Sequence, residues 1–255
     1  MSAASDHFRP SIDGDCATIT LNRPERHNSL DPADLAELRR LLDQVEGQPA
    51  VRVLVITGAG EKTFCAGFAL DQIADQDWKD RPFERAVERL EQVSVPTICA
   101  LNGGVYGGGV ELALACDFRI GVDGMNMFVP PARLGIHYPT SGLQRYVQRL
   151  GLNVAKRILV ACEKFDAQEL LRIGFVDALV PADGLTDRVS EWGTRIAALA
   201  PLSVQGMKQT LNEIARGTLQ PEEAAARIEA CWRSNDHQEG IAARAEKRNP
   251  QFTGT

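Results

Sequence analysis

Two stretches of this chain each combine a nearly continuous apolar run with a glycine-rich turn. VRVLVITG (51–58) continues into AGEKTFCAGFAL (59–70), and PTICALN (96–102) continues into GGVYGGGVELALACD (103–117). Apolar, β-branched runs of this kind are typical of strands that are covered on both faces, as in parallel sheets. The chain is therefore predicted to be an α/β protein in which glycine loops follow buried strands.

Strand-like and helix-like patterns alternate around these runs. The stretch 30–47 has apolar residues at helical spacing, with Asp31 as candidate N-cap, Pro32 at the first helical position and Gly47 as the stop. The other elements predicted in this half are strands at 16–24, 51–58, 96–102 and 118–122, and helices near 82–93 and 108–117.

After residue 140 the pattern becomes mainly helical. DAQELLRIGF (166–175) begins with the spacing of a capping box, in which Asp166 and Glu169 each satisfy a backbone N–H of the other. A short strand is predicted at 176–181, and helical patterns follow towards the C-terminus. An α/β half is thus followed by a mainly helical quarter, with neither an internal repeat nor a low-complexity segment.

Composition excludes several classes of protein. The 255 residues are 44% hydrophobic, enough for a sizeable core. A net charge of −6 and the lack of a dense Lys/Arg run argue against nucleic acid or an anionic membrane as partner. The six cysteines have no C-x-x-C spacing, so neither a disulfide framework nor a metal site is expected. Without an apolar leader or a run of eighteen apolar residues, we expect a cytoplasmic protein.

The glycines at 103–109 do not form a known nucleotide motif. A G-x-G-x-x-G pattern would need glycine where Tyr106 or Leu112 stands, and no Lys-Ser/Thr pair follows the last glycine. Bare backbone N–H groups at a helix N-terminus suit an oxyanion as well as a phosphate. Glu111 lies three residues after Gly108, and its spacing fits either a role in such a site or a favourable contact with the helix dipole.

Six segments together resemble the crotonase (enoyl-CoA hydratase/isomerase) family. They cover nearly the whole chain, in order and at the spacing of the family. The segments are LNRPERHNSL (21–30), VRVLVITGAGEKTFCAGFAL (51–70), VPTICALNGGVYGGGVELALACDFRI (95–120), RLGI with GLQRYVQRLG (133–151), DAQELLRIGFVDALVP (166–181) and EGIAARAEKRNPQF (239–252).

The resemblance implies a crotonase-like spiral of ββα units over residues 1–195 and a C-terminal helical trimerisation region over 196–255. It also implies a homotrimer, or a hexamer made as a dimer of trimers. Trp192, Met207 and Trp232 lie on apolar helix faces in the C-terminal part, where such contacts are expected.

The resemblance further implies an enzyme that acts on an acyl-CoA thioester, enoyl-CoA hydratase-like. The backbone N–H groups of Phe68 and Gly108 are expected to hold the thioester oxygen, with Glu111 as the acid/base. Coenzyme A is then part of the substrate, and no separate cofactor is expected. The residues expected at the coenzyme A moiety are Arg26, Ala66, Phe68, Leu70, Gly108 and Lys247, the last in its own or a neighbouring subunit.

The chain departs from the family pattern around the acyl group. Pro131 stands where many hydratases have a second glutamate, and Ala69 replaces the aspartate of the usual A-G-x-D segment. Phe68 is bulky where alanine is common, and Arg244 takes a position that is often Phe. The acyl pocket is therefore expected to be reshaped, and hydration by two carboxylates is not available.

Tyr138 follows the segment that holds Pro131, and P-x-x-L-G-x-x-Y resembles methylmalonyl-CoA decarboxylase in this one place. A tyrosine hydroxyl can orient a carboxylate or a water, so Tyr138 is a candidate catalytic residue; a half-buried structural tyrosine is the alternative. His137 beside it is either an acid/base or polar surface. The alternatives to hydration are isomerisation or decarboxylation of an acyl-CoA, or acyl-CoA binding without catalysis.

Overall fold

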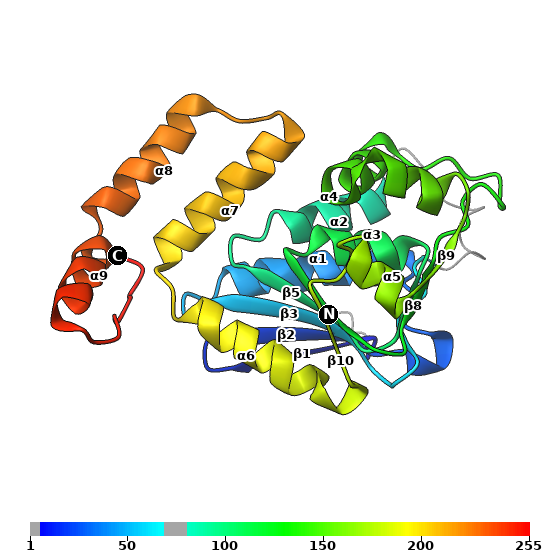
Figure 1. Cartoon of the computed structure of the whole chain (residues 1–255), viewed down its shortest axis with the longest axis horizontal. Helices are drawn as coiled ribbons and strands as arrows, with labels where there is room; N and C mark the ends of the chain where they lie inside the picture. The colour runs from blue at the N-terminus through cyan, green and yellow to red at the C-terminus, as the bar shows by residue number, and fades with distance from the viewer. Residues whose placement is uncertain (1–5, 69–80) are drawn as a thin grey trace.

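The computed structural model describes residues 6–68 and 81–255, and its largest element is a six-stranded sheet (Figure 1). Neighbouring strands are parallel, except that the first two form an antiparallel pair at one edge. The strands, in order across the sheet, are β1 (Phe8–Asp13), β2 (Cys16–Leu21), β3 (Val53–Gly58), β5 (Thr97–Leu101), β7 (Phe118–Val122) and β10 (Ala178–Val180). The predicted α/β class is confirmed.

A second sheet of four short strands lies at the ends of these strands. Its order is β4 (Thr63–Cys65), β6 (Gly104–Tyr106), β8 (Asn126–Phe128) and β9 (Lys164–Asp166). Three successive units each give one strand to each sheet and then a helix. β3 and β4 precede α2 (Pro82–Glu91), β5 and β6 precede α3 (Gly108–Ala115), and β7 and β8 precede α4 (Thr140–Leu159). This repetition is the predicted spiral of ββα units.

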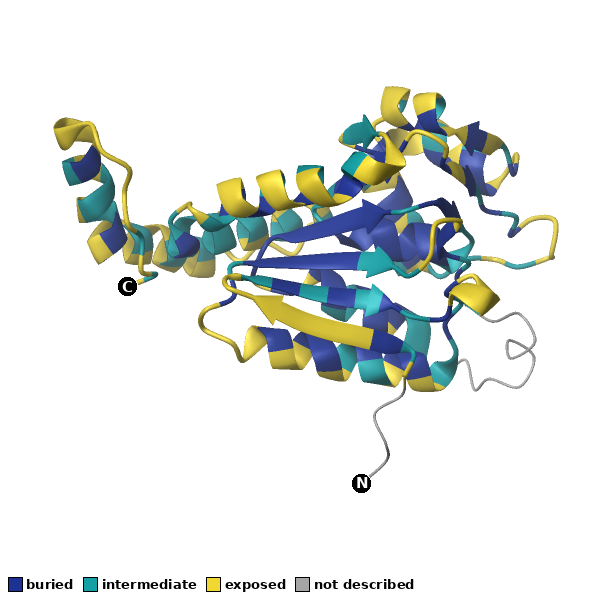
Figure 2. Cartoon of the chain, turned by 90° about the horizontal axis from the view of Figure 1, so that it is seen from below, coloured by how far each residue is buried: buried dark blue, intermediate teal, exposed yellow. Residues whose placement is uncertain are grey.

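Helices lie on both sides of the six-stranded sheet. α1 (Pro32–Glu46) packs against α2, and α6 (Leu185–Ala197), which follows α5 (Ala167–Arg172) and the 3-10 turn η3 (Ala182–Gly184), packs against β3, β5 and β7 on the opposite side (Figure 1). The central strands are buried, whereas the edge strand β1 is mostly exposed (Figure 2). The buried apolar side chains of sheet and helices form one continuous core.

The residues predicted to begin and end α1 do so in the structure. The Asp31 side chain accepts the backbone N–H of Asp34, the Asp34 side chain accepts the N–H of Asp31, and the helix ends at Gly47. At α5 only half of the predicted capping box forms. Asp166 accepts the N–H of Glu169, but the Glu169 carboxylate binds arginines and does not reach back to residue 166.

The last three helices extend away from the sheets and are called the tail here (Figure 1). They are α7 (Pro201–Arg216), α8 (Pro221–Arg233) and α9 (Asn235–Glu246). Pro201 is the one buried residue of α7, and α8 has none. The predicted boundary between residues 195 and 196 falls in the last turns of α6, and the division into two domains stays a prediction.

Of the three residues expected at subunit contacts, Trp192 differs from Met207 and Trp232. Its ring packs edge-on against Phe118 of β7, with 5.4 Å between ring centroids, so it belongs to the core of its own chain. Met207 and Trp232 are exposed on the tail. Within the described residues, no helix is both long enough and apolar enough to cross a membrane.

Candidate active site

The two glycine loops meet, as the sequence predicts. A Cβ built on Gly67, whose φ is +86°, would lie 2.5 Å from the backbone nitrogen of Gly108. A Cβ on Gly108 would lie 3.5 Å from the backbone nitrogen of Phe68. The amides of Phe68 and Gly108 therefore lie side by side, and neither donates a hydrogen bond to an acceptor in residues 6–68 or 81–255.

Close approach between α3 and β4 requires the glycine run. A Cβ on Gly109 would lie 2.5 Å from the carbonyl oxygen of Cys65, so any side chain there would push the first turn of α3 away. With glycine, the N-terminus of α3 abuts the loop that carries Phe68. The positive end of the helix dipole and two N–H groups are thus directed at one small region, which suits developing negative charge.

Glu111 lies one turn into α3 and is only 2% exposed. Its Oε1 accepts a hydrogen bond from Nη1 of Arg145 in α4 at 2.7 Å. A Cβ on Gly142 would lie 2.9 Å from both carboxylate oxygens, so this glycine lets α4 approach the acid. The pKa of Glu111 is raised to about 7, mainly by burial; Arg145 opposes the rise, and the carboxylates of Glu84 and Glu91 add to it. Near neutral pH this carboxyl can both accept and donate a proton.

The sequence analysis missed Arg145. Its guanidinium is buried and spans two carboxylates, because Nη2 donates to Oε2 of Glu91 at 2.9 Å while Nη1 binds Glu111. A signal was available, since Gly142, Arg145 and Tyr146 share the buried face of α4. A buried arginine needs a carboxylate partner, but the sequence does not tell which of 34 acidic residues supplies it.

Two tyrosines lie beside Glu111. Tyr138 is half-buried, and burial, with smaller contributions from the charges of Glu111 and Cys162, raises the pKa of its hydroxyl, which stays protonated. The ring of Tyr146 lies 6.2 Å from that of Tyr138, centroid to centroid. His137 is exposed, and its Nδ1 lies 2.8 Å from the carbonyl oxygen of Tyr138.

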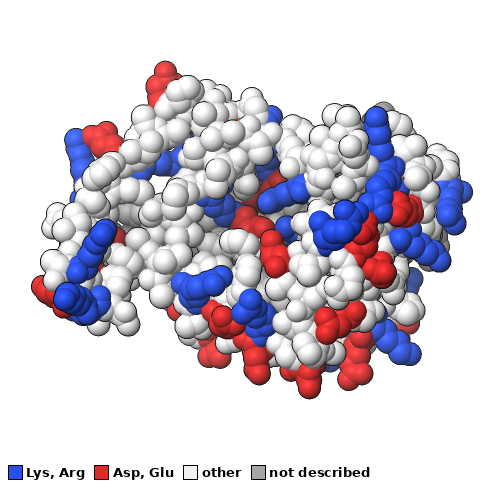
Figure 3. Space-filling view, in the orientation of Figure 1, with Lys and Arg blue, Asp and Glu red and all other residues white. Residues whose placement is uncertain are grey.

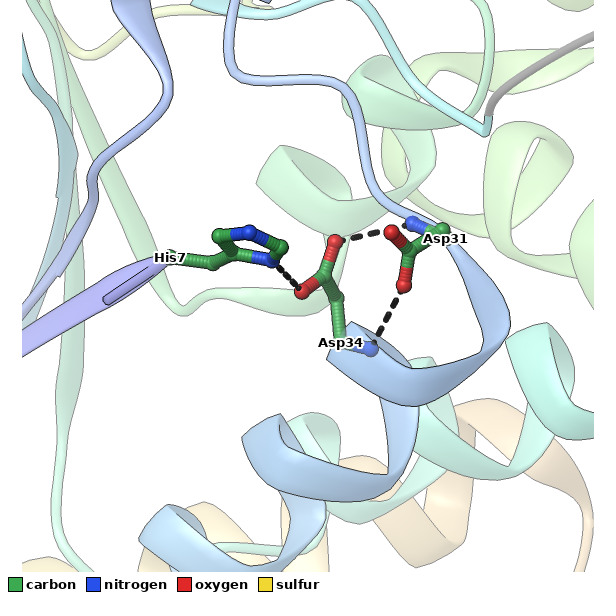
Figure 4. Close-up of side chains that lie close together, drawn as sticks. All are labelled: His7, Asp31 and Asp34. Atoms are coloured by element: carbon green, nitrogen blue, oxygen red, sulfur yellow. Dashed lines mark hydrogen bonds and ion pairs between the residues drawn. The ribbon is translucent and has the colours of Figure 1, made fainter. Parts of the chain in front are cut away.

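A group of side chains with metal-ligand chemistry lies next to the loop of Phe68, because Asp31 follows Leu30, whose N–H donates to the carbonyl of Gly67 at 2.8 Å (Figure 4). His7 Nδ1 is 2.6 Å from Asp34 Oδ1, and Asp31 completes the group. Arg23 Nη1 already binds both carboxylates, at 2.9 Å to Asp31 and 3.0 Å to Asp34. The guanidinium supplies the positive charge, so the group ties the chain before β1 to the start of α1.

Comparison with known proteins agrees with this geometry. The family profile "Enoyl-CoA hydratase/isomerase" matches residues 11–255. The chain belongs to the enoyl-CoA hydratase/isomerase (crotonase) family. It is 31% identical over 246 residues to a short-chain-enoyl-CoA hydratase of Clostridium acetobutylicum, which covers 92% of this chain and 93% of the relative. It is 34% identical over 255 residues to a carnitinyl-CoA dehydratase of Proteus mirabilis, which covers 94% of this chain and 96% of the relative.

The fold comparison leads to the same family. A putative enoyl-CoA hydratase/isomerase family protein from Hyphomonas neptunium superposes with a TM-score of 0.92 at 28% identity, over the full length of both chains. The prediction that this chain is an enzyme of the crotonase family, a lyase or an isomerase, is thus confirmed.

The residues expected at coenzyme A are only partly brought together. The Ala66 N–H donates to the carbonyl of His27, so the exposed Arg26, in the 3-10 turn η1 (Pro24–Arg26), lies next to the loop of Phe68. Lys247 ends α9, at the opposite end of the molecule from α3 (Figure 1). Within one chain it does not meet Arg26, Ala66, Phe68 or Gly108. Leu70 and Ala69 lie outside the described residues.

Position 131, where many hydratases of the family have a second glutamate, holds a proline in the structure, so no carboxyl group is available there. Pro131 is buried in the segment after β8, where its carbonyl accepts the N–H groups of Leu134 and Ile136 at 3.0 and 2.9 Å. Arg244 lies in α9 and lines an apolar groove between the tail helices, with Met207 and Trp232. In this chain Arg244 is therefore part of the tail surface and lies far from Glu111.

Proposed function

We propose that this protein adds water to, or removes it from, an acyl-CoA thioester whose carbonyl oxygen lies between the N–H groups of Phe68 and Gly108. The proposal is supported by one observation above all: two adjacent backbone N–H groups without an acceptor in the described residues lie one helical turn from a buried carboxyl with a pKa of about 7. Such a donor typically stabilises a transition state by roughly 2.7–4 kcal/mol.

Glu111 is the acid/base in this mechanism. The oxygen of water adds to the β-carbon of an enoyl group while Glu111 takes one of its protons. Negative charge then collects on the thioester oxygen as an enolate, where Phe68 and Gly108 donate to it. The proton is finally delivered to the α-carbon, so that one water is added across the double bond. A pKa of about 7 suits both proton transfers.

The coenzyme A moiety identifies the substrate class. Support comes from the relatives, which are named as hydratases and dehydratases of enoyl-CoA and carnitinyl-CoA. We assign its binding to Arg26, Ala66, Phe68, Leu70 and Gly108, with Lys247 contributed by a neighbouring subunit. No cofactor is assigned besides the coenzyme A of the substrate. A cytoplasmic location stays a prediction.

The decisive test removes one donor. Gly108→Pro deletes the N–H at the first position of α3, where a helix tolerates proline, and is expected to lower kcat roughly 10²–10³-fold. Gly108→Ala is the matched control, because it keeps the N–H and adds the same Cβ, which meets the ring of Phe83 at 2.8 Å. Crotonyl-CoA hydration is measured for both. Equal turnover of the two folded variants would contradict the oxyanion assignment.

Decarboxylation or isomerisation is the second candidate, favoured by Pro131. Both reactions need an enolate to be stabilised more than they need two acids, and the protonated Tyr138 beside Glu111 can orient a substrate carboxylate. The protein is incubated with enoyl-, β-hydroxy- and malonyl-type CoA thioesters, and products are followed by mass. Loss of carbon dioxide that is abolished in Tyr138→Phe would favour decarboxylation. If none of these thioesters is turned over, acyl-CoA binding without catalysis is the remaining function.

We also propose that the tail joins copies of this chain into a trimer or a dimer of trimers. The groove between α7, α8 and α9 is lined by Met207, Leu211, Ile228, Trp232 and Ile241, all of them exposed. An exposed apolar surface of this kind usually belongs to a subunit contact. A second copy of this chain is the occupant that fits the family resemblance of the tail.

A further inference from the structure

Several polar contacts hold α7 against the sheets and helices. Lys208 Nζ lies 2.6 Å from Asp117, just after α3, and donates to the carbonyl of Val95 at 2.8 Å. Three large apolar residues of α7, Met207, Leu211 and Ile214, are exposed. Figure 3 shows charged side chains of both signs where the tail meets the rest of the molecule, beside a largely uncharged tail surface.

A second set of contacts joins the end of α7 to the end of α2. Arg216 Nη2 lies 2.6 Å from Oε2 of Glu91, and Asn212 donates to the backbone carbonyl of Glu91 at 3.3 Å. Glu91 is buried, so its charge must be compensated by arginines and not by water. Two guanidiniums do so, because Arg145 binds the same oxygen at 2.9 Å.

Alternating charges therefore run without a break from the tail to the candidate acid/base. Arg216 binds Glu91, Glu91 binds Arg145, and Arg145 binds Glu111. The side chains of the last three are at least nine-tenths buried. In a buried environment, charges interact more strongly than in water, and a change at one member alters its neighbours.

We propose that Arg216 is a positioning residue for Glu111 and acts on it through Glu91 and Arg145. The proposal rests on the role assigned to Glu111 under the proposed function. With Arg216 in place, two guanidiniums compensate the charge of Glu91, and Arg145 can bind Glu111 as well. Without Arg216, only Arg145 compensates the charge of Glu91. Arg145 then binds Glu111 more weakly, and the negative charge of Glu91 acts more strongly on Glu111.

Both consequences act in the same direction. Arg145 lowers the pKa of Glu111 and the charge of Glu91 raises it, so loss of Arg216 raises it further above about 7. The other groups that face Glu111 are Glu84 of α2 and the hydroxyls of Tyr138 and Tyr146. Within the described part of the chain, Arg216 binds Glu91 and none of these three, so their effect on Glu111 is expected to stay constant. Docking of α7 and ionisation of Glu111 are thus linked.

The test measures the ionisation of Glu111 directly. The infrared band of a protonated carboxyl that disappears in Glu111→Gln reports its titration. In Arg216→Gln we expect the midpoint to rise by roughly half a unit to one unit, and the pH profile of turnover to move with it. Arg216→Lys keeps the positive charge and is expected to retain the wild-type midpoint. Lys208→Met removes the ion pair between α7 and Asp117 and is expected to leave the midpoint unchanged.

Three results are informative in different ways. An unchanged midpoint in folded Arg216→Gln would overturn the proposal. An equal shift in Lys208→Met would overturn it too, because docking of α7 in general would then be the cause. A midpoint that shifts while the pH profile of turnover stays in place would support the link from Arg216 to Glu111 and contradict the catalytic role of Glu111.

Discussion

Helices of the α/β core and helices of the tail both have clear apolar faces, but they cover them differently. In α1, Leu35, Leu38 and Leu42 are buried against the sheet of the same chain. In α7, Met207 and Leu211 are 57% and 64% exposed. Apolar spacing therefore predicts that a helix will bury one face, but it does not tell whether the partner lies in the same chain.

The two regions are consequently stabilised by different interactions. The core relies on apolar burial, worth about 1.5–3 kcal/mol for each large side chain. The tail is attached through a few ion pairs and hydrogen bonds, while its large apolar side chains Met207, Leu211 and Trp232 stay mostly exposed. We infer that the tail depends on a second copy of the chain for much of its stability, whereas the core does not.

A matched pair of leucines tests this difference most strongly. Leu42→Ala, in the fully buried face of α1, is expected to lower the free energy of unfolding by roughly 2–5 kcal/mol at any protein concentration. Leu211→Ala, in the exposed face of α7, should change it by less than about 0.5 kcal/mol in the dissociated chain. Urea unfolding is followed at low and high protein concentration. A large loss for Leu211→Ala at low concentration would show that the two faces are equally covered within one chain.

The two regions should also respond to pH with opposite sign. Burial raises the pKa of Glu111 to about 7, whereas an unfolded glutamate titrates near about 4.3. Between these values the folded protein keeps a proton that the unfolded chain has released. Stability from this group is therefore highest below about pH 4 and falls by roughly 3–4 kcal/mol as the pH rises through 7.

In the tail, a hydrogen bond from Arg248 lowers the pKa of Glu239 to about 2. This carboxylate contributes stability above the unfolded pKa, and the contribution is lost as the pH falls towards 2. The free energy of unfolding is measured against pH for the wild type, Glu111→Gln and Glu239→Gln. Relative to Glu111→Gln, the wild type should lose stability between about pH 4 and 7. Relative to Glu239→Gln, it should not lose stability over this range. A flat difference for Glu111→Gln would contradict the raised pKa.

Association through the tail is tested by removing its apolar side chains. In the double variant Leu211→Ser, Trp232→Ser we expect a monomer in light scattering at micromolar concentration, where the wild type should be a trimer or hexamer. Ile12→Ser, Val160→Ser is the matched control, since these apolar residues are exposed on the core. A monomeric wild type, or an equal effect of the control, would contradict the proposed tail contact.

Much of the fold follows from short-range signals. Asp31, Pro32 and Gly47 define α1 because a cap, a first-turn proline and a C-terminal glycine act within one turn of the backbone. β3 and β5 follow from their apolar runs. The strands β4, β6 and β8 were missed, because three residues are too few for a periodic pattern and their pairing depends on residues far away in the chain.

The candidate site also has parts that could be predicted from the sequence and parts that could not. The glycine pattern predicted that bare backbone from two loops is needed, and the family resemblance pointed to Phe68 and Gly108, whose amides lie side by side in the structure. The arginines were not predictable. Arg145 meets Glu91 across 54 residues and Arg216 meets it across 125, and neither spacing carries a local signal. Trp192 and Trp232 likewise look alike in sequence, but only Trp192 has an aromatic neighbour on the sheet.

The smallest expected effect concerns Tyr146, a polar exception inside the core. The residue is fully buried, and its hydroxyl has no hydrogen-bond partner within the described residues. A buried hydroxyl without a partner costs stability relative to an apolar group of the same shape. Tyr146→Phe is therefore expected to leave the free energy of unfolding unchanged or to raise it by up to about 1 kcal/mol, as measured by urea unfolding. Tyr138→Phe, the neighbouring half-buried ring, is the matched control. A loss of more than about 1 kcal/mol in Tyr146→Phe alone would mean that this hydroxyl is hydrogen-bonded, and Glu111 would be the first partner to test.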